Sequence, residues 1–187
     1  MISGQQECFE DGTSSRRSAA TSREPIDLLL QEQERVRIVA GMMSILADDL
    51  WQRGRECYAH SVLSFFKEEW PLRVDDEEYS LMPRLLARQG ATETARRMQT
   101  TLGQNHDLIR HAVTDIEERL CALMGGVIPI MPATFSVNLI RAEELVRQHM
   151  DWEEQTFFPW ARKRLMQPDM AAIWREMTER RGLSHLR

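Results

Sequence analysis

The sequence has few cysteines, and their positions do not favour cross-linking. Cys8, Cys57 and Cys121 are widely separated along the 187 residues, and no Cys-x-x-Cys pair occurs. Neither a disulfide framework nor a thiolate zinc site is indicated, because both need cysteines in matching number and regular spacing. This cysteine usage fits a reducing compartment and predicts a cytoplasmic protein.

Long apolar runs and an excess of positive charge are also missing. No stretch approaches the ~20 consecutive apolar residues that a membrane-spanning helix needs, and the N-terminus lacks the apolar core of a secretory signal. The formal net charge is -5 at pH 7, whereas a general nucleic-acid binder needs a basic face to displace counterions. We therefore expect neither a membrane nor a nucleic acid as a partner.

Strand signals are absent too, and apolar residues recur instead at helical spacing. Glycine or proline punctuates the ends of the long helical stretches, and Pro71 lies within the second of them, where it should kink the helix. The sequence therefore predicts an all-α protein, an up-and-down antiparallel four-helix bundle with a short C-terminal helix. The expected helices span residues 25–53, 55–90, 91–125, 132–165 and 168–182.

The two ends of the chain differ in composition from the rest. Residues 1–24 carry Gly, Ser, Thr and charged residues with almost no apolar periodicity, which predicts a disordered arm. Residues 25–182 hold the predicted bundle, and residues 183–187 form a short tail. A chain of 187 residues fits one domain with a sizeable core.

Two of the predicted helices carry the same motif. Residues 149–159 read His-Met-Asp-Trp-Glu-Glu-Gln-Thr-Phe-Phe-Pro, and residues 73–83 read Arg-Val-Asp-Asp-Glu-Glu-Tyr-Ser-Leu-Met-Pro. In both, a polar residue precedes a Glu-Glu pair by four positions, and two apolar residues and a proline follow. A helix places residues four apart on one face, so His149 and Glu153 point the same way. The first copy has Arg73 where the second has His149.

The other two long helices also share a pattern. Leu-x-x-Glu-Gln-x-x-Val-Arg begins at Leu29, and Leu-x-x-Asn-His-x-x-Ile-Arg begins at Leu102. Inward side chains at the same height on different helices of a bundle converge, which is how such folds build metal sites. We therefore expect one polar layer inside the bundle. Its members are Gln33, Arg73, Glu77, His106, His149 and Glu153.

The remaining histidines lack such a context. His60, His111 and His185 lie outside the repeated patterns, so we expect them at surface or boundary positions. A single histidine in an apolar stripe is more often a hydrogen-bonded residue than a metal ligand. It is the repetition of the spacing that favours ligands at His106 and His149.

These motifs resemble the hemerythrin-like family, often called the HHE cation-binding domain, over residues 25–182. The matching blocks are Leu-Leu-x-Glu in the first helix, Asp-Asp-Glu-Glu-x-x-Leu-Met-Pro in the second, Asn-His in the third, His-x3-Glu-Glu-x-x-Phe-Phe-Pro in the fourth, and a terminal Arg-Arg-Gly. The resemblance implies a four-helix bundle around a carboxylate-bridged di-iron centre. The family uses this centre for O2 binding or for iron and oxygen sensing.

The sequence departs from the family pattern at one of the two iron sites. Gln33 stands where the family has the histidine of the first helix, and Arg73 and Val74 stand where it has two histidines of the second. The resemblance therefore implies that this iron site is lost. The metal ligands that it leaves are Glu77, His106, His149 and Glu153, of which the glutamates bridge the two irons in the family.

Three interpretations stay open from the sequence. In the first, a single Fe, Mn or Zn ion binds the remaining ligands and serves metal or oxygen sensing or binding. In the second, no metal binds, and the guanidinium of Arg73 replaces the lost iron and neutralises Glu77 and Glu153. In the third, the bundle is a scaffold for a protein partner. No nucleophile or substrate pocket indicates an enzyme, and O2 transport by a di-iron pair is not expected.

Overall fold

A computed structural model describes residues 24–90 and 92–183, and these residues form helices and short connections without any strand. The all-α class predicted from the sequence is confirmed. Most of the expected disordered arm, residues 1–23, lies outside the described residues. The α-helices are α1 (Pro25–Asp48), α2 (Arg55–Ser64), α3 (Trp70–Asp75), α4 (Met82–Gln89), α5 (Glu93–Met124), α6 (Pro132–Trp152), α7 (Phe158–Arg162) and α8 (Gln167–Arg180). The π-helical segments are η2 (Phe65–Glu69), η3 (Asp76–Leu81) and η4 (Glu153–Phe157).

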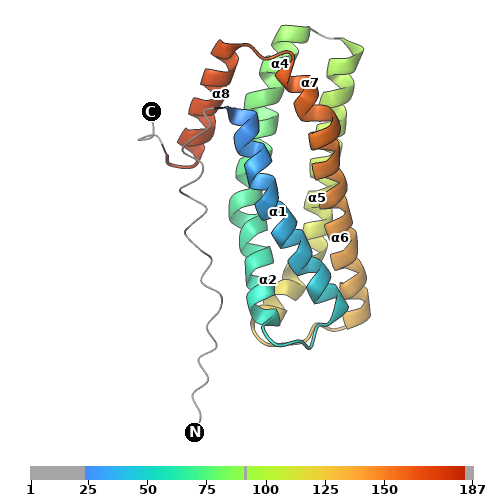
Figure 1. The fold of residues 1–187 in the computed structure, drawn as a ribbon. Helices are drawn as coiled ribbons and strands as arrows, with labels where there is room; N and C mark the ends of the chain where they lie inside the picture. The colour runs from blue at the N-terminus through green and yellow to red at the C-terminus, as the bar shows by residue number, and fades with distance from the viewer. Residues whose placement is uncertain (1–23, 91, 184–187) are drawn as a thin grey trace.

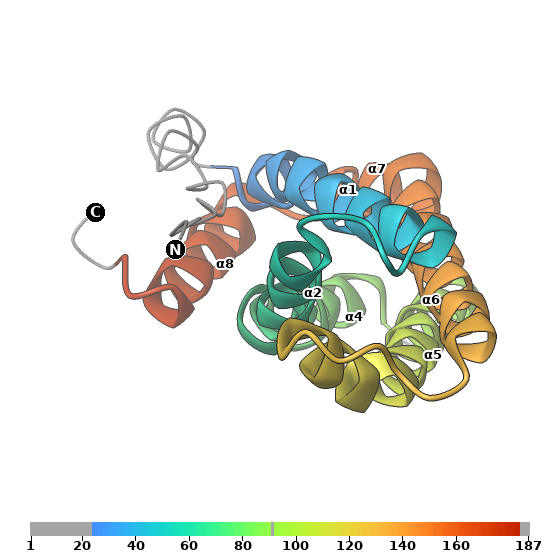
Figure 2. The same cartoon turned by 90° about the horizontal axis from the view of Figure 1, so that it is seen from below.

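Four long helical segments pack around a common interior (Figure 1). They are α1, the continuous stretch from α2 to α4, α5, and the continuous stretch from α6 to α7. The first segment packs against α2 and α6, and α5 packs against the same two neighbours. Helices α1 and α5 therefore lie across from one another, as Figure 2 shows in the view along the bundle.

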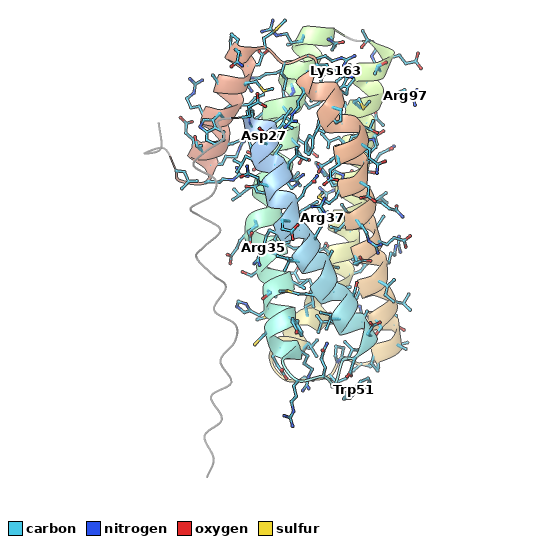
Figure 3. All side chains as sticks on the ribbon, viewed as in Figure 1. Asp27, Arg35, Arg37, Trp51, Arg97 and Lys163 are labelled. Atoms are coloured by element: carbon cyan, nitrogen blue, oxygen red, sulfur yellow. The ribbon has the colours of Figure 1, made fainter. Side chains whose placement is uncertain are left out.

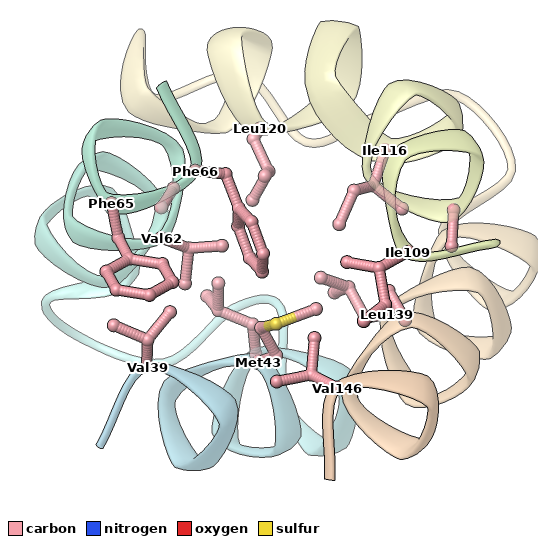
Figure 4. Close-up of a cluster of buried hydrophobic side chains, with 14 of the residues drawn as sticks. Val39, Met43, Val62, Phe65, Phe66, Ile109, Ile116, Leu120, Leu139 and Val146 are labelled. Atoms are coloured by element: carbon pink, nitrogen blue, oxygen red, sulfur yellow. The ribbon is translucent and has the colours of Figure 1, made fainter. Parts of the chain in front are cut away.

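The apolar stripes of these segments form two hydrophobic clusters. The first lies toward the end of the bundle that carries the α1–α2 connection, and Met43, Ile116 and Leu139 point into it from three helices (Figure 4). The second lies toward α8 and contains Leu85 and Ile173. Burying a large aliphatic or aromatic side chain stabilises a fold by roughly 1.5–3 kcal/mol, so these clusters dominate the stability of the bundle.

Each π-helical segment ends just before a proline. The prolines are Pro71 after η2, Pro83 after η3 and Pro159 after η4. Proline lacks a backbone N–H, and its ring crowds the carbonyl four residues earlier, so a regular α-helix cannot continue through it. The wider π turn accommodates the ring while the helix continues on both sides. The kink expected at Pro71 is thus a π-helical turn, and the repeated Glu-Glu motif produces the same turn twice.

Helix α8 is attached to the bundle by arginine–carboxylate pairs. Asp76 is fully buried and pairs with both Arg180 and Arg181. Arg181 also donates from Nε and Nη2 to the two oxygens of Glu32 on α1, at 3.0 and 3.1 Å. Glu32 and Asp76 each directly precede a residue of the predicted polar layer. Helix α8 therefore fixes two backbone positions beside that layer.

Charged side chains cover the outside of the bundle (Figure 3). Arg35 of α1 pairs with Glu69 at 3.3 Å, and Arg37 of α1 pairs with Glu154. Exposed pairs of this kind contribute only about 0–1 kcal/mol each, because water screens them. The charges that matter for stability are those inside the bundle.

The cysteines depart in part from expectation. Cys121 is free and exposed, whereas Cys57 is disulfide-bonded. Disulfide formation depends on the distance and direction of two side chains in space, which the spacing of cysteines along a sequence does not show. None of the helices in residues 24–90 and 92–183 combines the length and the apolar composition that crossing a membrane needs. The cytoplasmic location stays a prediction.

Candidate metal centre

A buried polar layer separates the two hydrophobic clusters. Each long helical segment contributes to it between residues of the two clusters, and its six members are at most 4% exposed. The structure thus brings together all six residues that the sequence predicted, Gln33, Arg73, Glu77, His106, His149 and Glu153. His60 and His111 are exposed, as expected. His185 lies outside the described residues.

Four residues of the layer direct their nitrogen or oxygen atoms to one point. Glu77, His106, His149 and Glu153 each offer one ligand atom, and these atoms lie within 4.8 Å of one another. Nε2 of His106 is 3.1 Å from Oε2 of Glu77, and Nε2 of His149 is 3.2 Å from Oε1 of Glu153. Imidazole and carboxylate ligands together suit Fe, Mn and Zn. This buried group therefore offers a ligand set for a metal ion.

Arg73 occupies the other side of the two glutamates. Its Nε lies 3.1 Å from Oε1 of Glu77, and its Nη2 pairs with Oε2 of Glu153. Its Nη1 donates to the carbonyl of Leu29 at 2.8 Å, and the amide of Gln33 donates to Oε2 of Glu153 at 3.1 Å. Each glutamate therefore turns one oxygen toward Arg73 and the other toward the histidines.

Both histidines are also contacted at Nδ1, the ring nitrogen that faces away from Glu77 and Glu153. Nδ1 of His106 lies 2.6 Å from Oε1 of Glu78, and Nδ1 of His149 lies 3.5 Å from the amide of Asn105. A carboxylate that accepts from one ring nitrogen fixes the ring and aims the other nitrogen at a metal. The repeated motif by itself does not predict a role for Glu78. The sequence feature that could have identified Glu78 is its place in the repeated Glu-Glu pair, next to Glu77.

Several buried atoms of the layer lack a well-aligned hydrogen bond. Among them are Nε2 of His149 and Oε1 of Glu153, which face each other at 3.2 Å, and Oε1 of Glu77, which lies 3.1 Å from Nε of Arg73. An unpaired buried polar group costs about 1–3 kcal/mol, so native proteins rarely leave one without a reason. A cation between Nε2 of His149 and Oε1 of Glu153 would pair with both atoms. The residues present therefore fit one metal ion on the histidine side of the layer.

The two buried glutamates ionise differently. Burial and the neighbouring Glu153 carboxylate raise the pKa of Glu77 to about 8. Burial opposes ionisation of Glu153 as well, but the charge of Arg73 and the interactions with His149 and Glu77 together outweigh it and lower the pKa of Glu153. Two adjacent carboxylates in a dry interior do not both ionise readily. Near neutral pH, Glu153 is the anion that pairs with Arg73.

The two histidines also differ. Burial lowers the pKa of His149. Burial acts in the same direction on His106, but hydrogen bonds to Glu77 and Glu78 outweigh it and raise the pKa of His106 to about 9. His149 is therefore neutral near pH 7 and keeps a free lone pair, which is the form that binds metals.

The metal-free protein should lose stability as the pH rises from about 6.5 to about 9. Folding raises the pKa of His106 from 6.5 to about 9, so its stabilising contribution is complete below pH 6.5 and is lost as the pH passes 9. Glu77, whose pKa rises from 4.5 to about 8, acts in the same direction. Urea unfolding at a series of pH values, with a chelator present, measures the effect.

His106→Gln should flatten this pH dependence above pH 8, where His106 alone of the two still titrates. The matched control is His111→Gln, because His111 is exposed on the same helix and should leave the curve unchanged. A stability that increases between pH 6.5 and pH 9 would contradict the assignment.

Comparisons with known proteins add no assignment to this geometry. Neither a family model, nor a curated protein, nor a solved structure matched the chain. The functional interpretation rests on the side chains of the polar layer and on their arrangement.

Proposed function

We propose that this chain is a hemerythrin-like protein that binds one divalent ion of Fe, Mn or Zn in its core and serves metal or oxygen sensing or binding. The observation that carries the proposal is the convergence of two imidazole nitrogens and two carboxylate oxygens within 4.8 Å in a buried layer. The packing of the long helical segments is compatible with the up-and-down four-helix bundle of that family.

Arg73 takes the role of a second cation in this proposal. The hemerythrin-like arrangement has two glutamates that bridge two metal ions. Here Glu77 and Glu153 lie between the guanidinium of Arg73 on one side and the histidines on the other. A guanidinium stays charged at any ordinary pH and offers carboxylates a planar fork of donors. It therefore neutralises one oxygen of each glutamate and leaves the other oxygens for one metal ion.

Residues around the polar layer would support a bound metal ion. A bound ion of the iron type would supply open positions for water or O2. Glu78 fixes the ring of His106 through Nδ1 at 2.6 Å. The Trp70 ring lies edge-on to both imidazoles, with centroids 6.2 Å from His106 and 5.8 Å from His149, and the layer beside it is buried. A dry setting strengthens the interaction between ligand charges and a cation.

Metal analysis of protein purified without a metal-affinity tag tests the proposal. We expect a metal content approaching one ion per chain in the parent and its loss in His149→Ala. A chelator should lower the melting temperature of the parent, because a ligand at 100 times its Kd stabilises the folded state by about 2.7 kcal/mol. His111→Ala removes an exposed histidine and should keep the metal. A parent that takes up no Fe(II), Mn(II) or Zn(II) and melts identically in chelator would overturn the proposal.

A second function is favoured by the balance of charge within the layer. Arg73 pairs with Glu153 and Glu77, and His106 pairs with Glu78, so the layer is neutralised by protein groups alone. In this alternative the chain is a metal-free structural or protein-interaction module. Trp51 and Ile130 are exposed on the two connections at one end of the bundle, where a protein partner would find apolar surface (Figures 1 and 3). Chelator has no effect on such a protein.

A further inference from the structure

A surface groove reaches the polar layer at His106. It lies between the α3–η3 stretch and α5, and its volume is about 390 Å³. Trp70 and Val74 contribute an apolar wall, and Glu78 lies on the same side. Of the six residues of the polar layer, His106 is the one that lines the groove. The groove therefore leads from solvent to one metal-binding residue of the proposed centre.

His106 and Glu78 together form the boundary between the groove and the interior. The imidazole contacts Glu78 through Nδ1 at 2.6 Å and contacts Glu77 through Nε2 at 3.1 Å. The side chain of Glu78 is 31% exposed, whereas that of Glu77 is fully buried. One carboxylate is thus accessible to a solvated ion, and the next lies directly behind the ring.

The charge of the groove favours a cation as the occupant. Its acidic lining residues outnumber its basic ones, and they are Asp75, Glu78, Asp107 and Glu117. A cleft lined by one sign of charge raises the local concentration of counter-ions. A second observation points to the same ligand, because Nε2 of His149 is buried, makes no well-aligned hydrogen bond and lies 3.2 Å from Oε1 of Glu153, so that a cation between these atoms would bind both. The imidazole centroids of His149 and His106 are 4.8 Å apart.

Two other directions of approach to the layer are unfavourable for an ion. Along the bundle axis it is covered on both sides by the hydrophobic clusters, where an ion would lose its hydration without gaining ligands. On the side away from the histidines, Arg73 presents a positive charge that repels a cation. The groove at His106 therefore offers the ion a polar path with ligands along it.

We propose that a divalent metal ion enters the buried layer through this groove and that Glu78 is the carboxylate that first binds it. This inference rests on the proposed metal centre. When Glu78 turns its oxygen to the incoming ion, it releases Nδ1 of His106, and the ring is free to turn and admit the ion. Once the ion is inside, Glu78 again accepts from Nδ1 and holds Nε2 toward the metal.

Stopped-flow binding of Co(II) alone, followed by its visible absorption, tests the role of Glu78. Glu78→Gln keeps a hydrogen-bond acceptor for His106 but removes the charge. We expect its association rate to fall about tenfold, as electrostatic steering of an ion predicts, while the stoichiometry stays that of the parent. The matched control is Glu118→Gln, because Glu118 is exposed on α5 and does not line the groove. Loading of Glu78→Gln at the parent's rate overturns the role of Glu78.

A second variant tests the route itself. Thr114 lines the groove and is exposed, so Thr114→Trp should obstruct the path. An obstacle slows movement in both directions, so the association and dissociation rates of Co(II) should fall by the same factor and Kd should not change. Gln148→Trp, on the exposed surface of α6, should change neither rate. If the parent binds Co(II) and Thr114→Trp leaves both rates unchanged, the route is wrong and the metal centre stands; a parent that binds none overturns both.

Discussion

Arg73→Ala should destabilise the metal-free protein by about 3–5 kcal/mol, because it leaves a buried charge without its partner. The substitution removes the cation that pairs with Glu77 and Glu153, both of which are fully buried. It also removes the donor to the carbonyl of Leu29. Urea unfolding in the presence of a chelator measures the loss. Stability should recover in part at lower pH, where the glutamates take up protons and no longer need a counter-ion.

Arg147→Ala is the matched control for this effect. Arg147 makes an ion pair with Glu143 at 2.8 Å, one turn apart on α6, but its side chain is 63% exposed. Its loss should cost only about 0.3–0.5 kcal/mol. Saturating metal should reduce the cost of Arg73→Ala, because the ion then neutralises the glutamates. If Arg73→Ala is strongly destabilised and chelator does not change the stability of the parent, the metal centre is contradicted. If Arg73→Ala is only slightly destabilised and chelator lowers the stability of the parent, the internal ion pair is contradicted.

Gln33→His combined with Arg73→His should raise the metal content above that of the parent by up to one ion per chain. Both positions face the glutamate oxygens that lie away from the histidines, and Nε2 of Gln33 is already 3.1 Å from Oε2 of Glu153. Two imidazoles there would restore two of the three histidines that the resemblance to the hemerythrin-like family implies for this side, since Val74 would stay. Metal analysis after aerobic loading with iron, together with the absorption of a bridged di-iron centre, gives the measurement.

Gln33→His alone is the informative control for the double variant. It leaves the guanidinium of Arg73 against Oε1 of Glu77 and Oε2 of Glu153, so a second cation would meet a positive charge. We therefore expect the single variant to bind no more metal than the parent. If the double variant also stays at the parent's metal content, these positions are not those of a lost metal site.

The sequence was sufficient to predict the helices and the membership of the polar layer. Helical period identifies which residues share a face, and proline or glycine marks ends such as Pro25, Pro132 and Gly90. Residues at the same height on inward faces then converge by packing alone. His106 and His149 come from different helices, yet their rings lie 4.8 Å apart.

The helix ends are the part of the fold that helical periodicity predicted less well. Helix α1 ends at Asp48 rather than near Arg53, because the carboxylate of Asp49 accepts a hydrogen bond from the N–H of Trp51 at 2.8 Å. Such a bond competes with continuation of the helix. Helix α7 ends at Arg162, ahead of the expected end of the fourth helix near Leu165. Periodicity averages over a whole helix and cannot detect one bond at its end.

The different roles of the residues in the polar layer could also not be predicted from their spacing in the sequence. Spacing places Glu77 and Glu153 on inward faces, but it does not show which oxygen of each faces Arg73. It also did not show that Glu78 contacts His106, because Glu78 is partly exposed and lies off the inward stripe. Hydrogen bonds depend on distances of a few tenths of an ångström between atoms. A helical repeat specifies only the direction of a side chain.

The arginine pairs that attach α8 have a consequence for shortened forms of the chain. Arg180 and Asp76 are 104 positions apart in the chain, and Arg181 and Glu32 are 149 apart. Removal of α8 and Arg181 would take away both arginine partners of the fully buried Asp76. A buried carboxylate without a partner is costly, so the segment that carries Glu77 depends for its position on a helix near the other end of the chain.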